Sequence, residues 1–499
     1  MRILLIYPPI TTYGPAAVGP HPPLGLAYIA AFLEQNNYEV RILDALALGG
    51  DNVQTNGNYN RFGLSEVNIT NYVRDFAPDI VGISVMFTAF VNDAYDVARV
   101  VKEVCPTTTV VFGGAHASIN PEAVLEDKNV DIAVQGEGEA TFLELVKTLE
   151  TKRDISEVTG VTFKKGGKIL SNSPRPLIAD LDSLPFPARH LLPMEAYNKS
   201  DSLFTMRQPL TSMITSRGCP RDCCFCSIHS VWGHSWRGRG AKSVVDELEH
   251  LTQAYSIREV HFLDDNISLN KKRMTEICDA IIDRKIDIRW TPPNGIAIWT
   301  LDRELLKKIK RSGCYRLTFG IESGNPETQK FIGKKLDRER VKEVIRNANS
   351  LGLWTLCTFI IGFPYETREA IYDTIDFAID SGTDLALFYR LGLWPGIPVY
   401  EIFRKEALLP EDDSQAYSEL AACDTKFLKG EELYELQRKA YKSFLTRRLF
   451  SFLNPLRLKR KIRSVEDLRY VLGLATIVPG MLLNMIKTKR GVSSQVLRG

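Results

Sequence analysis

Residues 215–226 read Thr-Ser-Arg-Gly-Cys-Pro-Arg-Asp-Cys-Cys-Phe-Cys and contain four of the nine cysteines in this 499-residue chain. Cys219, Cys223 and Cys226 have the spacing C-x3-C-x2-C, which lets three thiolates converge on one metal centre. An iron–sulfur cubane with three protein ligands keeps one iron open to an external ligand. The spacing also allows zinc, bound by the same cysteines and His229. Both metals are therefore candidates on this motif alone.

Downstream of the motif, short apolar runs alternate with amphipathic stretches, which predicts a partial (β/α)6 TIM-type barrel over residues 206–400. The expected strands are Ser212–Thr215, Glu259–Leu263, Ile288–Trp290, Arg316–Gly320, Thr355–Ile361 and Leu385–Phe388. Functional side chains of such barrels gather at the carboxyl ends of the strands. Acidic and glycine-rich segments stand at those ends, in residues 263–266, 320–325 and 361–366. A structural zinc site needs no such rim, so an iron–sulfur enzyme is favoured.

Upstream of the motif, residues 1–150 form another βα series, which predicts a Rossmann-like, doubly wound parallel sheet. The expected strands are Ile3–Tyr7, Val40–Leu43, Ile80–Val85, Val110–Phe112 and Asp131–Val134. Ligands of such α/β sheets bind beyond the carboxyl ends of the strands. Those ends carry unusual segments, among them Gly113-Gly114-Ala115-His116 and Gly136-Glu137-Gly138-Glu139. No G-x-G-x-x-G opens the first helix, so we do not expect a dinucleotide.

The remaining segments are a linker and a basic tail. Residues 151–205 predict a hairpin followed by a Pro-rich linker, and residues 401–499 predict a helical C-terminal region. From residue 447 onward there are twelve Lys/Arg and two Asp/Glu, a net charge of +10, within a chain of net charge +3. Two interpretations stay open: an interfacial segment that meets an anionic surface or substrate, and a helical lid with solvated lysines.

Composition and targeting signals bound the class of protein. With 44% hydrophobic and 25% charged residues, the chain is globular rather than disordered. Clustered, odd-numbered cysteines indicate a reducing compartment, and the N-terminal run predicts a strand rather than a signal peptide. The apolar tract Val471–Ile486 is shorter than the roughly 20 residues that a membrane span needs. We expect a cytoplasmic protein, with peripheral membrane contact through the basic region as one of the two interpretations above.

At these motifs the chain resembles a radical S-adenosylmethionine (SAM) enzyme with an N-terminal cobalamin-binding domain. The resemblance covers roughly residues 1–400 and rests on C-x3-C-x-aromatic-C, with Phe225 as the aromatic residue. It implies that the three thiolates hold a [4Fe–4S] cluster whose open iron chelates SAM. Electrons from an external donor then cleave SAM to a 5′-deoxyadenosyl radical.

The resemblance also implies the SAM-binding residues. Asp264 and Asp265 stand where the family contacts the methionine amino group, and a carboxylate suits an ammonium group. Glu322 and Ser323 stand where it contacts the ribose and methionine moieties. Gly362 belongs to a segment that resembles the strand behind the adenine, and Phe225 completes the set. Glu366 follows where the family often has Glu, although helix capping explains it equally well.

For cobalamin, the resemblance implies contacts from the first unit. The expected residues are Pro23, Leu24, Gly25, Asp44, Ser84, Met86, Phe87, Gly113, Gly114, His116, Gly136, Glu137 and Gly138. The cobalt-ligating motif D-x-H-x-x-G is absent, which implies base-off cobalamin without a histidine below the cobalt. Met86 or Phe87 would then lie nearest that lower face. Core positions for these two residues, and a structural role for His116, are the alternatives.

The resemblance implies methylation of an unactivated carbon of a small-molecule substrate, through the 5′-deoxyadenosyl radical and methylcobalamin. The apolar and basic tail suggests that this substrate is lipid-like or anionic. The alternative within the family is an oxidative cyclase or rearrangement enzyme, such as the anaerobic porphyrin cyclase. A non-catalytic cobalamin- or zinc-binding module is the alternative from another class. We expect no nucleic-acid partner, because no RNA-binding module is present and aromatics do not interleave with the basic run.

Overall fold

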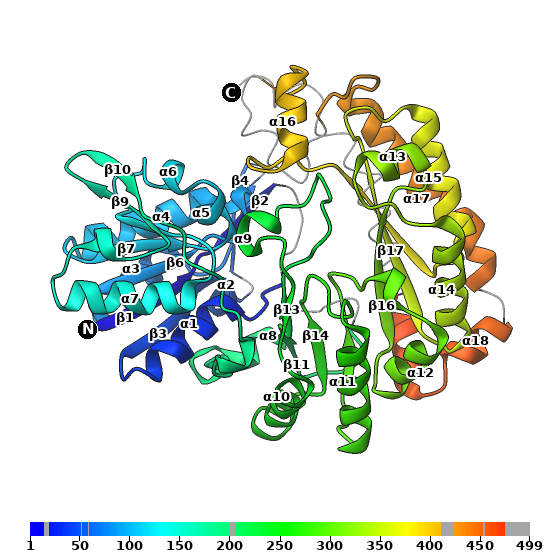
Figure 1. Ribbon diagram of the computed structural model, residues 1–499, viewed down its shortest axis with the longest axis horizontal. Helices are drawn as coiled ribbons and strands as arrows, with labels where there is room; N and C mark the ends of the chain where they lie inside the picture. Colours follow the sequence, from blue (N-terminus) through cyan, green and yellow to red (C-terminus); the bar gives the residue numbers. More distant parts are fainter. Residues whose placement is uncertain are drawn as a thin grey trace.

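The computed structural model describes residues 1–13, 19–50, 52–57, 59–198, 205–410, 423–452 and 455–474. Two α/β units lie side by side, one from the N-terminal part of the chain and one from its middle (Figure 1). We call residues 1–171 the first unit and residues 210–405 the second unit. No helix within the described ranges is long and apolar enough to cross a membrane.

The first unit is a seven-stranded sheet with the order β10-β9-β8-β7-β6-β1-β3. Its strands are β1 (Arg2–Tyr7), β3 (Glu39–Asp44), β6 (Ile80–Ser84), β7 (Thr109–Gly113), β8 (Ile132–Val134), β9 (Val161–Lys165) and β10 (Lys168–Ser171). The five strands from β3 to β8 are parallel, as predicted. The hairpin β9–β10, expected within the connecting segment, adds two antiparallel strands to this sheet.

Alternate residues of β1 explain why helices cover both faces of the sheet. Ile3 and Leu5 pack with α1 (Leu24–Glu34) and α7 (Gly138–Glu150), whereas Leu4 and Ile6 pack on the face of α3 (Glu66–Phe76) and α4 (Val91–Val104). A strand buried on both sides must be apolar at every position, and the interior of β1 is. The shorter helices are α2 (Ala45–Gly49), α5 (Ala115–Ile119), α6 (Pro121–Val124) and α8 (Met194–Tyr197).

A small antiparallel sheet beside the first unit is an addition that the sequence did not predict. It consists of β2 (Ile10–Tyr13), β4 (Val53–Asn56) and β5 (Tyr59–Phe62), in the order β2-β5-β4. These strands are short and lie largely at the surface, and they give no clear hydrophobic period in the sequence.

The second unit contains six parallel strands in chain order, as predicted. They are β11 (Leu210–Met213), β14 (Glu259–Phe262), β15 (Arg289–Thr291), β16 (Arg316–Glu322), β17 (Trp354–Ile361) and β18 (Leu385–Arg390). They form two three-stranded sheets, which a bridge between Trp290 and Cys314 connects. The surrounding helices are α9 (His229–Trp232), α10 (Ala241–Ala254), α11 (Lys271–Asp283), α12 (Arg303–Arg311), α13 (Pro326–Phe331), α14 (Arg338–Ser350), α15 (Arg368–Asp380) and α16 (Pro398–Lys405). The strands do not form one continuous sheet, so the partial barrel stays a prediction.

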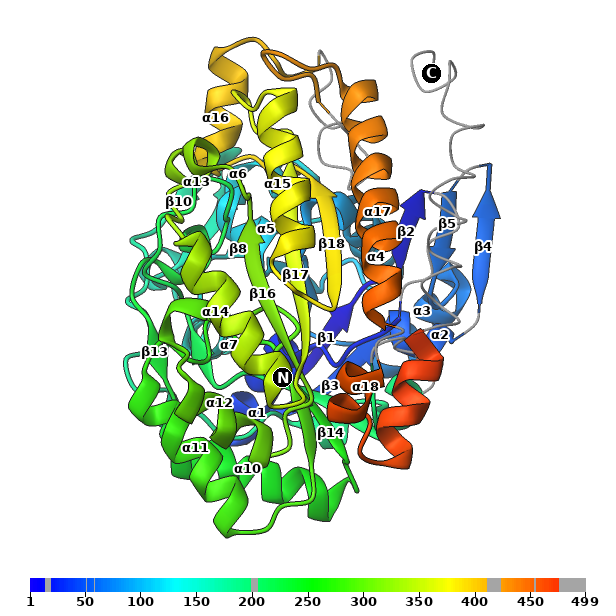
Figure 2. The same cartoon turned by 90° about the vertical axis from the view of Figure 1, so that its right-hand side faces the viewer.

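Helix α17 (Gly430–Phe452) covers the edge strand β18 (Figure 2). The Tyr441 hydroxyl accepts a hydrogen bond from the Phe388 amide at 3.0 Å, and the Gln437 amide donates to the Phe388 carbonyl at 2.6 Å. Side chains of α17 thus satisfy backbone groups that an edge strand would otherwise expose. The described part of the C-terminal region is helical, as predicted, and α17 lies along the side of the second unit. Most of the tract Val471–Ile486 lies outside the described residues.

Candidate functional site

Loops that follow the carboxyl ends of the strands lie between the two units (Figure 1). In the first unit, the pairs Tyr7–Asp44 and Ser84–Gly113 place the strand ends at one edge of the sheet. In the second unit, the turn after β18 reaches this edge: a Cβ on Gly396 would lie 2.4 Å from the Ile119 side chain. Segments that were predicted separately as two ligand-binding rims therefore meet.

The cysteine loop, residues 218–236, leaves the second unit at its carboxyl-end rim. Strands β12 (Ser216–Arg217) and β13 (Arg237–Gly238) pair antiparallel and hold the two ends of the loop together. Gly218 has a φ of +89°, and a Cβ there would lie 2.3 Å from the Ser235 carbonyl oxygen. Only glycine fits at this position, which explains why it directly precedes the first cysteine.

The three thiols of the motif face a common, partly buried space. Cys219 raises the pKa of both Cys223 and Cys226, after the larger effect of burial, and the pKa of Cys226 reaches about 11. Within the described ranges, only Asp222, His229 and His234 bring three metal-ligand atoms within 4.8 Å of one another. A single zinc would place its sulfur ligands about 3.8 Å apart. The three thiols of the motif do not form such a compact group within the described ranges.

The two adjacent aspartates have different surroundings. Asp264 is 1% exposed and accepts hydrogen bonds from the Thr215 amide and hydroxyl at 3.1 and 2.7 Å and from the Ser216 hydroxyl. Asp265 is less buried, accepts one bond from the Gly218 amide at 2.9 Å, and has a pKa raised to about 6 by burial. Asp264 therefore holds the start of the cysteine loop, and Asp265 is the one better placed for a ligand.

Glu322 lies beside the thiols together with Lys334, a residue that sequence reasoning missed. The Lys334 ammonium donates to the Glu322 carboxylate at 2.7 Å, and its charge opposes the rise that burial causes in the pKa of the Cys223 thiol. Glu322 has a φ of +67°, an uncommon conformation for a non-glycine residue. A buried carboxylate, a partly buried ammonium and two thiols thus share one space. In the sequence, the feature that could have pointed to Lys334 is the Gly333-Lys334 pair that follows α13.

The other three predicted SAM contacts differ in how open they are. The Ser323 hydroxyl is 1% exposed and bonds to the Thr374 hydroxyl at 3.0 Å, so it stabilises the turn after β16. Phe225 is partly buried, and its ring centroid lies 5.9 Å from that of Phe363. Gly362 has a φ of +94° at the end of β17, and its amide donates to the Glu366 carboxyl group at 2.8 Å.

On the first unit, the loop after β6 is open and apolar. Met86 and Phe87 are 49% and 55% exposed, so neither is a core residue. His116 is only 6% exposed and its Nδ1 lies 2.9 Å from the Thr88 hydroxyl. Burial lowers the pKa of His116 to about 4, so the ring is neutral. These positions fit the structural role for His116 and an apolar surface near Met86 and Phe87.

Glycines provide most of the open space along this edge. A Cβ on Gly25 or Gly113 would have no neighbour within 4 Å, whereas a Cβ on Gly114 would lie 2.7 Å from the Val85 carbonyl oxygen. Gly136 has a φ of +70° and faces Val231 of α9, and a Cβ on Gly138 would lie 2.8 Å from Ile29. Gly25 and Gly113 are therefore the two positions where a ligand can approach the backbone without displacing protein.

The remaining predicted cobalamin residues are buried or partly buried behind the ligand-binding edge of the first unit. Asp44 accepts a hydrogen bond from the Ala47 amide at 2.9 Å and one from the Tyr197 hydroxyl at 2.7 Å, and it is 1% exposed. Pro23 and Leu24 begin α1 and are buried, and Ser84 ends β6 and is partly buried. The Asp44 side chain is thus used to cap α2 rather than left open.

Glu137 contacts the second unit. Its carboxylate accepts hydrogen bonds from Arg217 at 2.6 Å and from Arg237 at 2.9 Å. Arg217 belongs to the cysteine motif, but the sequence alone assigns it no role. The partners of an arginine at a strand end become visible only in the fold.

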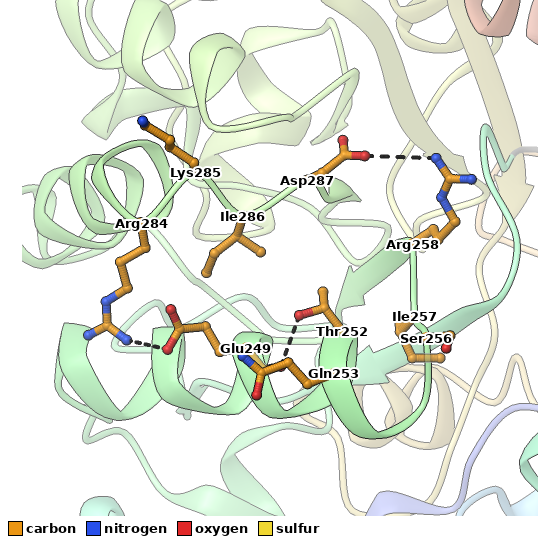
Figure 3. A pocket seen from close by; sticks show the side chains of 10 residues that line it. All are labelled: Glu249, Thr252, Gln253, Ser256, Ile257, Arg258, Arg284, Lys285, Ile286 and Asp287. Atoms are coloured by element: carbon orange, nitrogen blue, oxygen red, sulfur yellow. Dashed lines mark hydrogen bonds and ion pairs between the residues drawn. The ribbon is translucent and has the colours of Figure 1, made fainter.

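A separate cavity of about 420 Å³ lies at the other end of the strands (Figure 3). It is lined by residues before β14 and β15 and by the ends of α10 and α11. Four of its charged residues pair with one another, Arg284 with Glu249 at 2.9 Å and Arg258 with Asp287 at 3.8 Å. This cavity is therefore remote from the cysteine loop and is not part of the site.

Comparisons with known proteins support both halves of the site. Residues 213–378 match the radical SAM superfamily, and residues 11–146 match the B12 binding domain. An uncharacterized methyltransferase of Pyrococcus horikoshii is 37% identical over 90% of this chain and 93% of the relative. Cytidylyl-2-hydroxyethylphosphonate methyltransferase of Streptomyces wedmorensis is 33% identical over 90% of each. The anaerobic magnesium-protoporphyrin IX monomethyl ester cyclase of Cereibacter sphaeroides is 28% identical over 81% of this chain and 64% of the relative.

A solved structure shares the fold. The cobalamin-dependent SAM radical enzyme OxsB, with aqua-cobalamin and SAM bound, superposes with a TM-score of 0.71 at 16% identity and covers 97% of this chain and 72% of its own. Fold and site together define an iron–sulfur enzyme in which a radical-generating unit faces a cobalamin-binding sheet. The chain belongs to the radical SAM superfamily and carries the B12-binding domain of its cobalamin-dependent methyltransferases. Its cofactors are a [4Fe–4S] cluster, SAM and cobalamin.

Proposed function

We propose that this methyltransferase acts on an unactivated carbon of a small molecule that is lipid-like or anionic. The observation that carries the proposal is the meeting of the cysteine loop with the glycine-lined edge of the first unit. When bound, the cluster and SAM supply a 5′-deoxyadenosyl radical, and cobalamin supplies the methyl group. The chain itself has to hold both cofactors and the substrate close together and away from water.

For the cluster, we assign Cys219, Cys223 and Cys226 as ligands. Their shared space and their C-x3-C-x2-C spacing support this assignment. Burial raises the pKa of Cys223, and the Lys334 charge opposes that rise and so favours the thiolate that a metal needs. The fourth position of the cluster is left to SAM.

For SAM, we assign Asp265 to the amino group and Glu322 with Lys334 to the rest of the methionine and ribose part. Asp265 keeps carboxylate capacity that Asp264 has already used on Thr215 and Ser216. The Lys334 ammonium is the charge that suits a carboxylate of the ligand. Gly362 and Phe225 complete the walls, whereas Asp264 and Ser323 act by holding the loops.

For cobalamin, we assign residues 1–150 as the binding domain, with Gly25 and Gly113 approached by the ligand and Met86 and Phe87 beneath it. The exposed apolar side chains of Met86 and Phe87 support a cobalamin that would be held there without a histidine ligand. Residues 206–400 are then the radical SAM core, and 401–499 the C-terminal region. An external electron donor completes the set of partners.

The competing function within the family is oxidative cyclisation without net methyl transfer. A methylase adds one methyl group to the substrate and forms S-adenosylhomocysteine as well as 5′-deoxyadenosine. The test is anaerobic turnover of the enzyme, loaded with iron, sulfide and cobalamin, with methyl-labelled SAM and candidate small molecules. Label in a product supports the proposal, whereas 5′-deoxyadenosine and an oxidised product without label would support the cyclase.

We further propose that the enzyme is cytoplasmic and meets membranes through a C-terminal surface. This surface consists of the exposed residues Pro455, Leu456, Lys459, Arg460, Arg463, Val465, Leu468, Arg469 and Leu472. It contains apolar and basic side chains and no acidic one, since Glu466 pairs with Arg207 at 2.8 Å and Asp467 is buried. All nine cysteines are free, which agrees with a reducing compartment.

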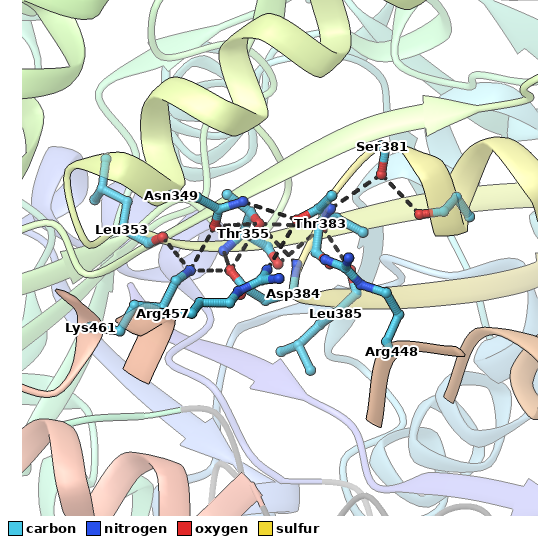
Figure 4. Close-up of polar contacts among 12 residues, drawn as sticks. Asn349, Leu353, Thr355, Ser381, Thr383, Asp384, Leu385, Arg448, Arg457 and Lys461 are labelled. Atoms are coloured by element: carbon cyan, nitrogen blue, oxygen red, sulfur yellow. Dashed lines mark hydrogen bonds and ion pairs between the residues drawn. The ribbon is translucent and has the colours of Figure 1, made fainter. Parts of the chain in front are cut away.

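A buried polar cluster anchors the C-terminal surface to the second unit (Figure 4). Asp384 bonds to Arg457 at 2.6 Å and to Lys461, and Lys461 donates to the Leu353 carbonyl at 2.8 Å. Apolar side chains with cationic neighbours favour anionic lipid surfaces. The chain should therefore co-sediment with phosphatidylglycerol vesicles. The double variant Leu468→Asp, Leu472→Asp should no longer co-sediment. Equal sedimentation of wild type and double variant would refute this contact.

A further inference from the structure

We propose that Arg217 is a positioning residue that fixes the cysteine loop to the cobalamin-binding unit, so that the two cofactor sites keep one mutual geometry. The residue stands two positions before the first cysteine and is 5% exposed. The role of Arg217 in the reaction rests on the proposed function, whereas its contacts are independent of that function.

The guanidinium of Arg217 binds two carboxylates of the other unit. One nitrogen, Nη1, donates to Glu137 at 2.6 Å, and the other, Nη2, donates to Glu139 at 2.6 Å. Both glutamates are as buried as the arginine, at 5% and 4% exposure. The planar fork of an arginine can hold two carboxylates at fixed angles, which a lysine ammonium cannot do.

Aromatic rings from both units enclose the same guanidinium. It lies 5.4 Å from the ring centroid of Tyr28, on α1 of the first unit, and 5.2 Å from that of Trp232, on α9. Cation–π contacts of this kind are stronger where water is excluded. Arg217 therefore contacts both sides of the interface, and a shift of one unit relative to the other would break some of its contacts.

A second arginine of the second unit also binds Glu137 of the first unit. Arg237 pairs with Arg217 in the β12–β13 ladder and donates to Glu137 at 2.9 Å. Glu137 also accepts a bond from the Ile178 amide at 2.6 Å. Two cations and two anions thus balance inside the interface, as buried charges require.

The path from this cluster to each cofactor site is short. On one side, Arg217 is followed by Gly218, whose amide is bonded to Asp265, and then by Cys219. On the other side, Glu137 lies between Gly136 and Gly138 at the cobalamin-binding edge. Misplacement by about 1 Å of a group that orients reactants can cost roughly 100-fold in rate. The contacts of Arg217 are therefore well placed to set the distance between the cobalt and SAM.

The first arm of the test uses the chain without cofactors. Arg217→Lys keeps the charge and removes the fork, and hydrogen exchange should become about 10-fold faster both in residues 216–238 and in residues 134–140. Arg175→Lys is the matched control, because Arg175 binds Glu144 and Thr141 of α7 without reaching the cysteine loop. The control should affect α7 and leave residues 216–238 unchanged. Faster exchange near residue 217 alone would overturn the proposal.

The second arm uses the loaded enzyme. Arg217→Lys should keep iron content, hydroxocobalamin affinity and cobalamin-independent 5′-deoxyadenosine formation within about 2-fold of wild type. Formation of S-adenosylhomocysteine should fall by about 10-fold or more, because only this product needs SAM and the cobalt in register. Glu139→Gln should show the same pattern more weakly. A parallel fall of both products and of iron content would indicate general destabilisation and overturn the proposal. If wild type forms no S-adenosylhomocysteine, the proposed function fails while the exchange arm still tests Arg217.

Discussion

The two facing edges of the site are built in opposite ways. The second unit presents side chains with chemistry of their own, the three thiols with Asp265, Glu322 and Lys334. The first unit presents open glycines and exposed apolar side chains, and its polar residues Asp44 and His116 are buried in contacts within the protein. One edge should therefore depend on particular functional groups, and the other on empty space.

The sharpest test of this contrast removes the functional groups of the second unit. Changing Cys219, Cys223 and Cys226 together to Ala should abolish iron binding, because these thiolates are the assigned ligands of the cluster. It should also abolish 5′-deoxyadenosine formation, because SAM cleavage needs the cluster. Cobalamin affinity should stay within about 2-fold of wild type, since the first unit keeps its own core. Iron and sulfide analysis, SAM cleavage and hydroxocobalamin titration measure the three quantities.

Cys224→Ala is the matched control for the triple variant. Cys224 lies in the same loop but breaks the spacing, and its amide bonds to the Ile332 carbonyl at 3.2 Å through the backbone alone. It should retain iron. Retained SAM cleavage in the triple variant would contradict the assignment of the cluster ligands.

Much of this contrast could be predicted from sequence, for identifiable reasons. Apolar periods and strand-end glycines located the parallel strands, and the cysteine spacing located the loop. The finer roles could not be predicted, because Asp264 and Asp265 are neighbours with the same side chain and differ only in what surrounds them. Glu137 looked like a ligand contact for the same reason, and its arginine partners lie 80 and 100 residues away.

The corresponding test on the first unit fills the empty space. Gly113→Val should weaken hydroxocobalamin binding by at least about 10-fold, or about 1.4 kcal/mol, because the new side chain occupies the room left for the ligand. Stability of the cofactor-free chain should change little, since a Cβ at Gly113 meets nothing within 4 Å. Binding titration and thermal unfolding measure the two effects.

Gly114→Ala should give the reverse result and so serves as control. A Cβ at Gly114 would lie 2.7 Å from the Val85 carbonyl oxygen, and the φ of +102° is strained for alanine. Loss of stability in both variants would show that Gly113 also serves the fold rather than a ligand.

A pH-dependent effect is expected at Glu366, on the rim of the second unit. Burial raises the pKa of Glu366 to about 8, and its Oε1 has no hydrogen-bond partner among the described residues. The folded chain therefore keeps this proton from pH 4.5 to 8 while the unfolded chain loses it, so stability falls as the pH rises through that range. The slope is roughly 1.4 kcal/mol per pH unit. Glu366→Gln removes the effect, so the variant should exceed wild type in unfolding temperature at pH 8 and approach it at pH 5.

Glu369→Gln controls for the loss of one carboxyl group, because Glu369 is exposed in the first turn of α15. Its difference from wild type should not grow with pH. A constant difference for Glu366→Gln would mean that the Glu366 carboxyl is ionised in the folded chain.

The last expected change concerns His116 and completes the comparison of the two edges. His116→Ala should cost about 1–3 kcal/mol of stability, because the Thr88 hydroxyl loses its buried partner. The absorbance spectrum of bound cobalamin should not change, since the ring is buried against Thr88 and cannot reach a ligand as well. Met86→His, which places an imidazole at an exposed position on the same loop, should shift that spectrum toward histidine ligation. Spectral loss of a histidine ligand in His116→Ala would instead show that the first unit, like the second, binds its cofactor through a functional side chain.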